Sequence, residues 1–312
     1  MCEANHTQIT QVILLGFQGL NQFKPLFFIV ALVSYVVILF GNLLIVMLVT
    51  TVDRLKIPMF VFLKHLAIAD VLQVSTTVPL MLNIILVEEM VLSVVGCFAQ
   101  LYFFGVFVYV QCYIIAAMSY DRYLAICTPL RYASLMNPQV CFQIAVGLWF
   151  FGTLMLSSEM IVLCQLSFCG LNYIDHFFCD FAPVVELATS DKSHFLIQDF
   201  VTTLFMIPLP FVFILMTYIS ISVTILKMAS ANRRKKTFST CSSHLATVCT
   251  SYGSLITVYV VPMDYNIANI NKYRSFLYIM VAPLMNPIIY SLRNQEVKRA
   301  LLKVLSNFRT TL

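Results

Sequence analysis

Charged residues are scarce in this chain of 312 residues. Asp, Glu, Lys and Arg make up 11% of it, against 60% apolar residues, and the mean hydropathy is +0.89. Soluble domains carry about 25% charged residues, so these values exclude an ordinary soluble domain. The scarcity is also local, because residues 98–120 contain no Asp, Glu, Lys, Arg or His. A helix of that length can cross the hydrocarbon core of a bilayer.

Seven apolar stretches predict an all-α membrane protein, a bundle of seven transmembrane helices. The predicted spans are residues 26–50, 59–87, 98–120, 140–158, 200–226, 238–261 and 276–292. We expect an amino-terminal segment over residues 1–25, the bundle over 26–292 and a tail over 293–312. In the tail, apolar residues at helical spacing lie opposite basic ones, which predicts a short amphipathic helix on the membrane surface. The apolar residues are Val297, Leu301, Val304, Leu305 and Phe308.

Positive charge is nearly missing from one side of the predicted bundle. Only four of the 19 Lys and Arg residues fall there: Lys24, Lys192, Lys272 and Arg274. Most of the 14 acidic residues share that side, including Glu159, Asp180 and Asp199. Because cytoplasmic connections retain Lys and Arg, we expect a multi-pass protein of the plasma membrane with the amino terminus outside and the carboxyl terminus in the cytoplasm. Topology and contact with membrane lipids explain the net charge of +5, so no nucleic-acid partner is expected.

The amino terminus lacks the pattern of a cleaved signal peptide, a basic region followed by a short apolar core and a small-residue cleavage site. It does contain Asn5, which begins an Asn-His-Thr glycosylation sequon. Since this segment is expected outside the cell, we predict that Asn5 is glycosylated.

The chain also lacks the patterns of several other protein classes. Its ten cysteines have neither zinc-site nor redox spacing, and no Ser-His-Asp arrangement indicates an enzyme. A transporter would show repeated halves and intramembrane charges, and a channel would need pore-lining rings; neither pattern is found. Cys97 lies at the outer end of a span and Cys179 in a long outer loop, and the compartment on this side is oxidising.

Four sequence blocks, in order along nearly the whole chain, resemble odorant receptors. They are Pro-Met-Phe with Phe-Leu at residues 58–63, Met-Ser-Tyr-Asp-Arg-Tyr-Leu-Ala-Ile-Cys at 118–127, Lys-Thr-Phe-Ser-Thr-Cys-Ser-Ser-His at 236–244, and Pro-Leu-Met-Asn-Pro-Ile-Ile-Tyr-Ser-Leu-Arg-Asn at 283–294. The Asp-Arg-Tyr element alone indicates a rhodopsin-like G-protein-coupled receptor. The other blocks indicate its olfactory branch.

The resemblance implies a receptor that binds a small odorant and activates a heterotrimeric G protein of the stimulatory, olfactory type, raising cyclic AMP. A chemosensor for a metabolite in another tissue would carry the same motifs. A disulfide between Cys97 and Cys179 is implied as well. Many relatives form a second bridge from the position of Cys169 to a cysteine about twenty residues on, but residues 187–190 contain none. Cys169 and nearby Cys164 are therefore left without an assigned role, and the loop is expected to be looser.

The resemblance further implies an activation switch. Asp70 would join Asn42 and Asn286 in a polar cluster that often holds Na⁺, although Gln111 stands where many relatives carry a second acid. Arg122 would pair with Asp121 at rest and be released on activation. The predicted switch residues are Asp70, Asp121, Arg122, Tyr123, Tyr218, Asn286, Pro287 and Tyr290. Pro287 permits a helix kink, and the basic residues 233–236 are an expected contact for the G protein.

What the predicted pocket lacks indicates its ligand. Span three has no Asp to serve as an amine counter-ion, and span seven has no Lys to form a retinal Schiff base. Positions matching the family pocket are Phe104, Gly105, Val108, Tyr109, Thr202, Thr203, Met206, Tyr252, Leu255, Ile256, Tyr259 and Ile279. Such a lining suits a small, mostly uncharged organic molecule, and the alternative for each position is packing between helices. His176 and Asp180 resemble part of a proposed Cu²⁺ or Zn²⁺ site, for which a bridged Cys179 would no longer supply a thiolate.

Overall fold

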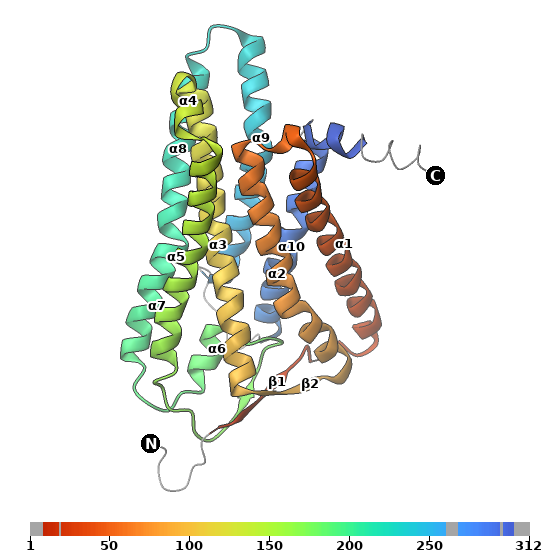
Figure 1. Cartoon of the computed structure of the whole chain (residues 1–312). Coiled ribbons are helices and arrows are strands. Elements are labelled where there is room, and N and C mark those ends of the chain that lie inside the picture. The colour runs from red at the N-terminus through yellow and green to blue at the C-terminus, as the bar shows by residue number, and fades with distance from the viewer. Residues whose placement is uncertain (1–8, 19, 260–267, 294–295, 303–312) are drawn as a thin grey trace.

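Seven long helical segments lie side by side in the computed structural model, which describes residues 9–18, 20–259, 268–293 and 296–302 (Figure 1). The segments are α1 (Lys24–Thr51), α2 (Pro58–Val87), α3 (Val94–Cys127), α5 (Pro138–Leu163), α7 (Ser193–Met206) with α8 (Pro208–Leu226), α9 (Ala231–Tyr259) and α10 (Ala268–Arg293). Shorter elements are the 3-10 turns η1 (Asn21–Phe23) and η2 (Asp53–Leu55) and the helices α4 (Pro129–Leu135) and α6 (Phe181–Glu186).

Five of these segments are long and apolar enough to cross a membrane on their own: α1, α2, α3, α5 and α7 with α8. A sixth is obtained if α10 and the short helix Glu296–Leu302 are taken as one bent span. Large apolar side chains such as Phe40, Phe150 and Leu226 are more than two-thirds exposed on the outside of the bundle. Lipid tails can cover such a surface at no cost, whereas water cannot.

Local sequence explains where several helices begin. Ser93 Oγ accepts a hydrogen bond from the Gly96 amide at the start of α3, and Asn137 Oδ1 accepts one from the Val140 amide at the start of α5. Pro208 occupies the first turn of α8 and cannot donate to α7, so the fifth span is interrupted at Ile207. All seven predicted spans are helical where described, apart from the break at Ile207, and most of the helices extend beyond the predicted spans at one end or both.

Helix α3 lies at the centre of the bundle. It contacts α2, α5, α7, α8 and α9, and its residues Tyr109, Val110 and Ile114 are completely buried. Because α3 runs from one end of the bundle to the other (Figure 1), it connects any site at one end with any site at the other.

A three-stranded sheet lies across one end of the bundle, and no sequence pattern predicted it. Strand β1 (Gln11–Leu15) pairs in antiparallel fashion with β2 (Glu89–Ser93) and in parallel with β3 (Tyr173–Ile174), giving the order β2-β1-β3 (Figure 1). The buried Lys272 of α10 ties the sheet to the bundle: its Nζ donates to the Gly16 backbone oxygen at 2.8 Å and pairs with Asp175.

Two predictions fall outside the part of the chain that the structure describes. Asn5 lies in residues 1–8, and most of the predicted tail helix lies in residues 303–312. The described part of the tail, Glu296–Leu302, is helical, with Val297 buried. The three regions expected along the chain remain predictions.

Candidate functional site

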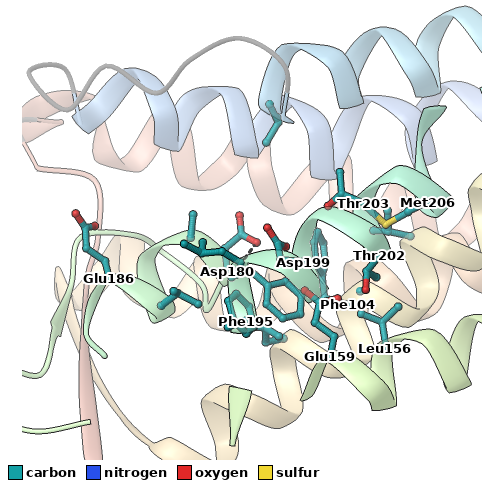
Figure 2. Close-up of a pocket in the computed structure, with 18 of the residues that line it drawn as sticks. Phe104, Leu156, Glu159, Asp180, Glu186, Phe195, Asp199, Thr202, Thr203 and Met206 are labelled. Atoms are coloured by element: carbon teal, nitrogen blue, oxygen red, sulfur yellow. Dashed lines mark hydrogen bonds between the residues drawn. The ribbon is translucent and has the colours of Figure 1, made fainter. Parts of the chain in front are cut away.

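A cavity of about 530 Å³ lies among α3, α5, α6 and α7, in the half of the bundle covered by the sheet (Figures 1 and 2). Its walls are mostly apolar and aromatic. Residues that line it include Leu101, Phe104, Gly105, Val108, Leu156, Glu159, Asp180, Phe181, Val185, Glu186, Lys192, Phe195, Asp199, Thr202, Thr203, Met206 and Val258. Its volume lies within the range of pockets that hold small organic ligands.

Six of the predicted pocket residues line this cavity: Phe104, Gly105, Val108, Thr202, Thr203 and Met206. They come from two neighbouring walls, α3 and α7. Gly105 lets α5 approach α3 closely, because a Cβ atom there would lie 2.7 Å from Leu156 Cδ1. A side chain at this position would have to displace Leu156, another residue of the lining.

The other predicted pocket residues lie elsewhere. Four are buried among the helices away from the cavity: Tyr109, Tyr252, Leu255 and Ile279. Tyr109 stacks on Tyr113 with ring centroids 5.2 Å apart, and Tyr252 packs on Phe211 at 5.0 Å. Ile256 is exposed, and the side chain of Tyr259 is outside what the structure describes. For the four buried residues, packing is the role that the contacts indicate.

Four acidic residues in the lining were not predicted as ligand contacts: Glu159 on α5, Asp199 on α7, Asp180 before α6 and Glu186 at the end of α6 (Figure 2). Glu159 and Asp180 are only 2% and 5% exposed. Asp180 Oδ1 accepts a hydrogen bond from the Phe181 amide at 2.9 Å and so caps α6. Burial, aided by the nearby Asp199 and opposed by that hydrogen bond, raises the pKa of Asp180 to about 6.

The disulfide between Cys97 and Cys179 is confirmed. This bridge ties the loop that contains Asp180 to the first turn of α3. The loop is held there also by Gln100, whose Oε1 accepts a hydrogen bond from the Cys179 amide at 3.0 Å. Cys169, to which the sequence assigned no role, is engaged in a disulfide. Cys164 is a free, exposed thiol.

The residues suggested for a Cu²⁺ or Zn²⁺ site are engaged otherwise. His176 is buried with its Nε2 3.3 Å from Ser275 Oγ, and burial lowers its pKa to about 3. Cys179 is bridged, and Asp180 caps a helix. Within the described ranges, no group of three His, Cys, Asp or Glu residues is placed to hold a metal ion.

The polar cluster expected around Asp70 is assembled deep in the bundle. Asp70 accepts hydrogen bonds from Asn286 at 2.8 Å and from Gln111 at 3.0 Å, and Gln111 also donates to Gln73 Oε1. Asn42 donates to the Pro283 backbone oxygen, while Oδ1 of Asn42 and Oδ1 of Asn286 are buried with no hydrogen-bond partner among the described atoms. One carboxylate and two amide oxygens fit the donor set of a hard cation such as Na⁺.

The end of α3 that lies away from the cavity carries an ion pair. Asp121 is fully buried and accepts hydrogen bonds from Arg122 Nη2 at 2.6 Å and from the Tyr132 hydroxyl at 2.8 Å. Tyr123 packs on a small apolar cluster made by α8 and α9, namely Ile221, Ile225 and Cys241. Tyr132 was not among the predicted switch residues, and it belongs to α4, a helix that hydropathy did not reveal.

Helices α3, α8 and α9 are joined near this end by a buried histidine. Tyr218 Oη lies 2.6 Å from His244 Nδ1, and His244 Nε2 lies 3.1 Å from the Ile115 backbone oxygen. His244 closes the third sequence block of the resemblance, which was the available signal for its role. Tyr290 is buried on α10 beyond Pro287, and its hydroxyl has no hydrogen-bond partner in the described part of the chain.

Comparison with known proteins agrees with this arrangement. The family model described as "Olfactory receptor" matches residues 30–308. The human olfactory receptor 11A1 is 42% identical over 297 residues, covering 95% of this chain and 94% of the relative. The human olfactory receptor 10A7 is 41% identical over 98% of this chain and 96% of its own length. The mouse olfactory receptor 5P76 is 42% identical over 97% of both chains.

Identity of this extent over nearly the full length, together with a mostly helical bundle, establishes the family. The chain belongs to the olfactory receptor family, and it is therefore a multi-pass, seven-transmembrane G-protein-coupled receptor and not an enzyme.

Proposed function

We propose that this receptor binds a small organic odorant in the cavity among α3, α5, α6 and α7 and activates a stimulatory, olfactory-type heterotrimeric G protein that raises cyclic AMP. One observation carries the proposal: α3 lines the cavity with Phe104, Gly105 and Val108 and, about four turns further along, bears the buried Asp121–Arg122 pair. A single helix thus connects a ligand-sized cavity with a charged element at the other end of the bundle.

The lining supports binding of a molecule whose body is mostly apolar and uncharged. Phe104, Val108, Leu156 and Met206 offer apolar surface, and Thr202 and Thr203 offer hydroxyl groups. Micromolar affinity corresponds to about 8 kcal/mol, which ten to fifteen buried heavy atoms can supply. A ligand activates the receptor only to the extent that it binds the active conformation more tightly than the resting one.

For activation, we propose that Arg122 leaves Asp121 and contacts the G protein as the bundle opens at this end. The closed arrangement is supported by the Arg122–Asp121 pair, by Tyr132 and by the Tyr218–His244 contact that joins α8 to α9. Asn286 and Pro287 in α10 would adjust the polar cluster at Asp70 during the change. Rearrangements of this kind are typical of helix movements between two packed states.

We propose the plasma membrane as the location, with the cavity and the sheet on the outer side and Arg122 on the cytoplasmic side. The distribution of Lys and Arg supports this orientation. An odorant would then enter from outside, and the basic residues 233–236 at the start of α9 would face the G protein and the anionic inner leaflet.

A cyclic AMP assay tests the proposal in cells that express the chain with the olfactory G protein, across an odorant panel and with surface expression measured. Thr203→Phe should fill part of the cavity and lower sensitivity to active odorants at least tenfold. The matched control is Ile197→Phe, which adds the same side chain on an exposed face of the same helix α7. Arg122→Ala should abolish every response. Responses that survive Arg122→Ala at normal surface expression would refute the proposed coupling.

A further inference from the structure

The cavity has one acidic wall. Figure 2 shows the carboxyl groups of Glu159, Asp180 and Asp199, from three different elements, at the cavity. Glu159 lies within hydrogen-bonding reach of Asp199 and of the buried Thr202, and Asp199 also acts electrostatically on Asp180. Three acids from α5, from the loop before α6 and from α7 therefore form one continuous acidic wall.

No basic side chain of the described part of the chain neutralises this region. The ion pairs among the described residues leave out Glu159, Asp180 and Asp199. They join Lys24 to Glu88, Lys56 to Asp53, Arg122 to Asp121, Lys272 to Asp175 and Arg299 to Glu296. Lys192, the one basic residue in the lining, directs its Nζ to the backbone oxygen of Glu186. Residues 260–267 contain neither Lys nor Arg. With Glu186, the lining holds four acids against one lysine.

Buried carboxyl groups in such a cluster lack a cation. A carboxylate removed from water is stabilised chiefly by a paired cation or by hydrogen-bond donors. Glu159 is 2% exposed, faces the cavity, and has another acid and a hydroxyl as its polar neighbours. A metal ion does not fit, because no group of three metal-binding side chains is suitably placed among the described residues. The missing positive charge can instead be carried by the ligand.

We propose that the cavity binds small amines in their protonated form, with the ammonium group between Glu159 and Asp199 near Asp180 and the apolar body against Phe104, Val108 and Leu156. The ammonium group donates hydrogen bonds to the carboxylates, which it also neutralises. This inference rests on the proposed function in taking the cavity as the odorant site, and it names the ligand class. The counter-ion that span three lacks is supplied by α5 and α7.

The test uses matched pairs of a primary amine and the corresponding alcohol, with chains and rings of four to ten carbon atoms. Binding is measured as the shift in thermal unfolding of the purified receptor, and activation as cyclic AMP in cells. We expect the best amine to bind at least tenfold more tightly than its alcohol. Glu159→Gln and Asp199→Asn should each remove this preference while leaving alcohol binding within about threefold. Asp191→Asn removes an equal charge from an exposed loop outside the lining and should change neither.

Several results would overturn the inference: amines that bind no better than their alcohols, no amine that shifts unfolding, or an amine preference that persists in both Glu159→Gln and Asp199→Asn. If these variants fail to fold, the comparison of amine and alcohol on the unaltered receptor still decides. Amine binding without cyclic AMP would support the inference and contradict the proposed coupling. Activation by neutral odorants without amine binding would contradict the inference and support the proposed coupling. The failure of one can therefore be distinguished from the failure of the other.

Discussion

Asp121 is fully buried and is held by two hydrogen-bond donors, Arg122 and Tyr132. Arg122 neutralises the charge of the carboxylate and Tyr132 donates a hydrogen bond to it. Without these two partners, burying the carboxylate would be costly. Asp121 and Arg122 belong to α3 and Tyr132 to α4, so the hydrogen bond from Tyr132 to Asp121 also holds α4 against α3. We therefore regard Asp121 as the residue on which the closed state depends most.

Tyr132→Phe should raise basal cyclic AMP several-fold. The substitution removes one hydrogen bond to an ionised group, which contributes about 1.5–3 kcal/mol, and each 1.4 kcal/mol changes an equilibrium tenfold. Tyr132 is only partly buried, so water can replace part of the lost hydrogen bond and the measured change should be smaller than the full tenfold or more. The control is Tyr102→Phe, whose hydroxyl contacts Ser157 instead. Unchanged basal signalling at equal surface expression would show that Tyr132 does not stabilise the closed state.

Asp180 should make the stability of the ligand-free receptor depend on pH. Burial raises its folded-state pKa from 3.8 to about 6, so the folded protein binds more protons than the unfolded chain between these values. The free energy of unfolding contributed by this group therefore falls as the pH rises from about 4 to 6, by up to about 3 kcal/mol. Asp180→Asn keeps an oxygen to cap α6 and removes the charge.

We expect Asp180→Asn to unfold at a higher temperature than the unaltered receptor at pH 7.5, with the difference vanishing near pH 4. Thermal unfolding of both purified proteins across this range measures it, and the difference between them cancels the other titrating groups. A variant that is less stable at pH 7.5, or a difference independent of pH, would contradict this account of the carboxyl group.

The acids of the cavity also show what hydropathy could and could not predict. The predicted span 140–158 ends one residue before Glu159, and the predicted span 200–226 begins one residue after Asp199. Both boundaries were set there because a charge was taken to mark the membrane surface. The structure places both residues inside helices α5 and α7. A charge that faces a cavity can lie within a span, and one sequence without contacts does not distinguish this case from a charge at the membrane surface.

At the scale of elements, α1 and α10 approach each other closely at Gly41. A Cβ atom added there would lie 2.9 Å from Pro287 Cβ, and the proline ring cannot rotate away. This contact lies at the proline that is expected to give α10 its kink. The glycine therefore serves the packing of two helices that are far apart in sequence.

Gly41→Ala should lower the stability of the purified receptor by about 1–3 kcal/mol, the usual cost of overpacking a core. Gly147→Ala on α5 is the matched control, since an added Cβ there meets no atom within 4 Å. It should be neutral or stabilising by up to about 1 kcal/mol, because alanine favours a helix over glycine. Thermal unfolding measures both, and equal effects of the two substitutions would refute the close approach.

The helices were predictable because twenty or more apolar residues in a row have few alternatives. The sheet was not. Strand β1 is only five residues long, and its partners β2 and β3 are separated from it by more than seventy and more than one hundred and fifty residues. No local pattern indicates such pairing, and Lys272, which ties the sheet to α10, was counted only as a loop charge.

At the scale of the whole molecule, the cavity and the Asp121–Arg122 pair lie at opposite halves of one bundle. Helix α3 contributes to both sites, and α7 with α8 runs alongside it from the cavity to Tyr218 and its contact with His244. A ligand that pulls α5 and α7 toward each other at Glu159 and Asp199 would also act on α8, which continues α7 and is joined to α9 through Tyr218 and His244. Both sites then bias one equilibrium between two packed states.

The most direct test is the distance between α4 and the start of α9, measured by pulsed electron paramagnetic resonance on receptor in nanodiscs. Spin labels would be attached at the exposed positions Leu130→Cys and Arg233→Cys, after Cys164→Ser and Cys249→Ser remove the exposed free thiols of the described residues. The account predicts a longer-distance population when an activating ligand binds, and none in the Thr203→Phe variant at the same concentration. A ligand that stabilises the receptor thermally and activates it without changing this distance would contradict the claim that the cavity controls the opposite end.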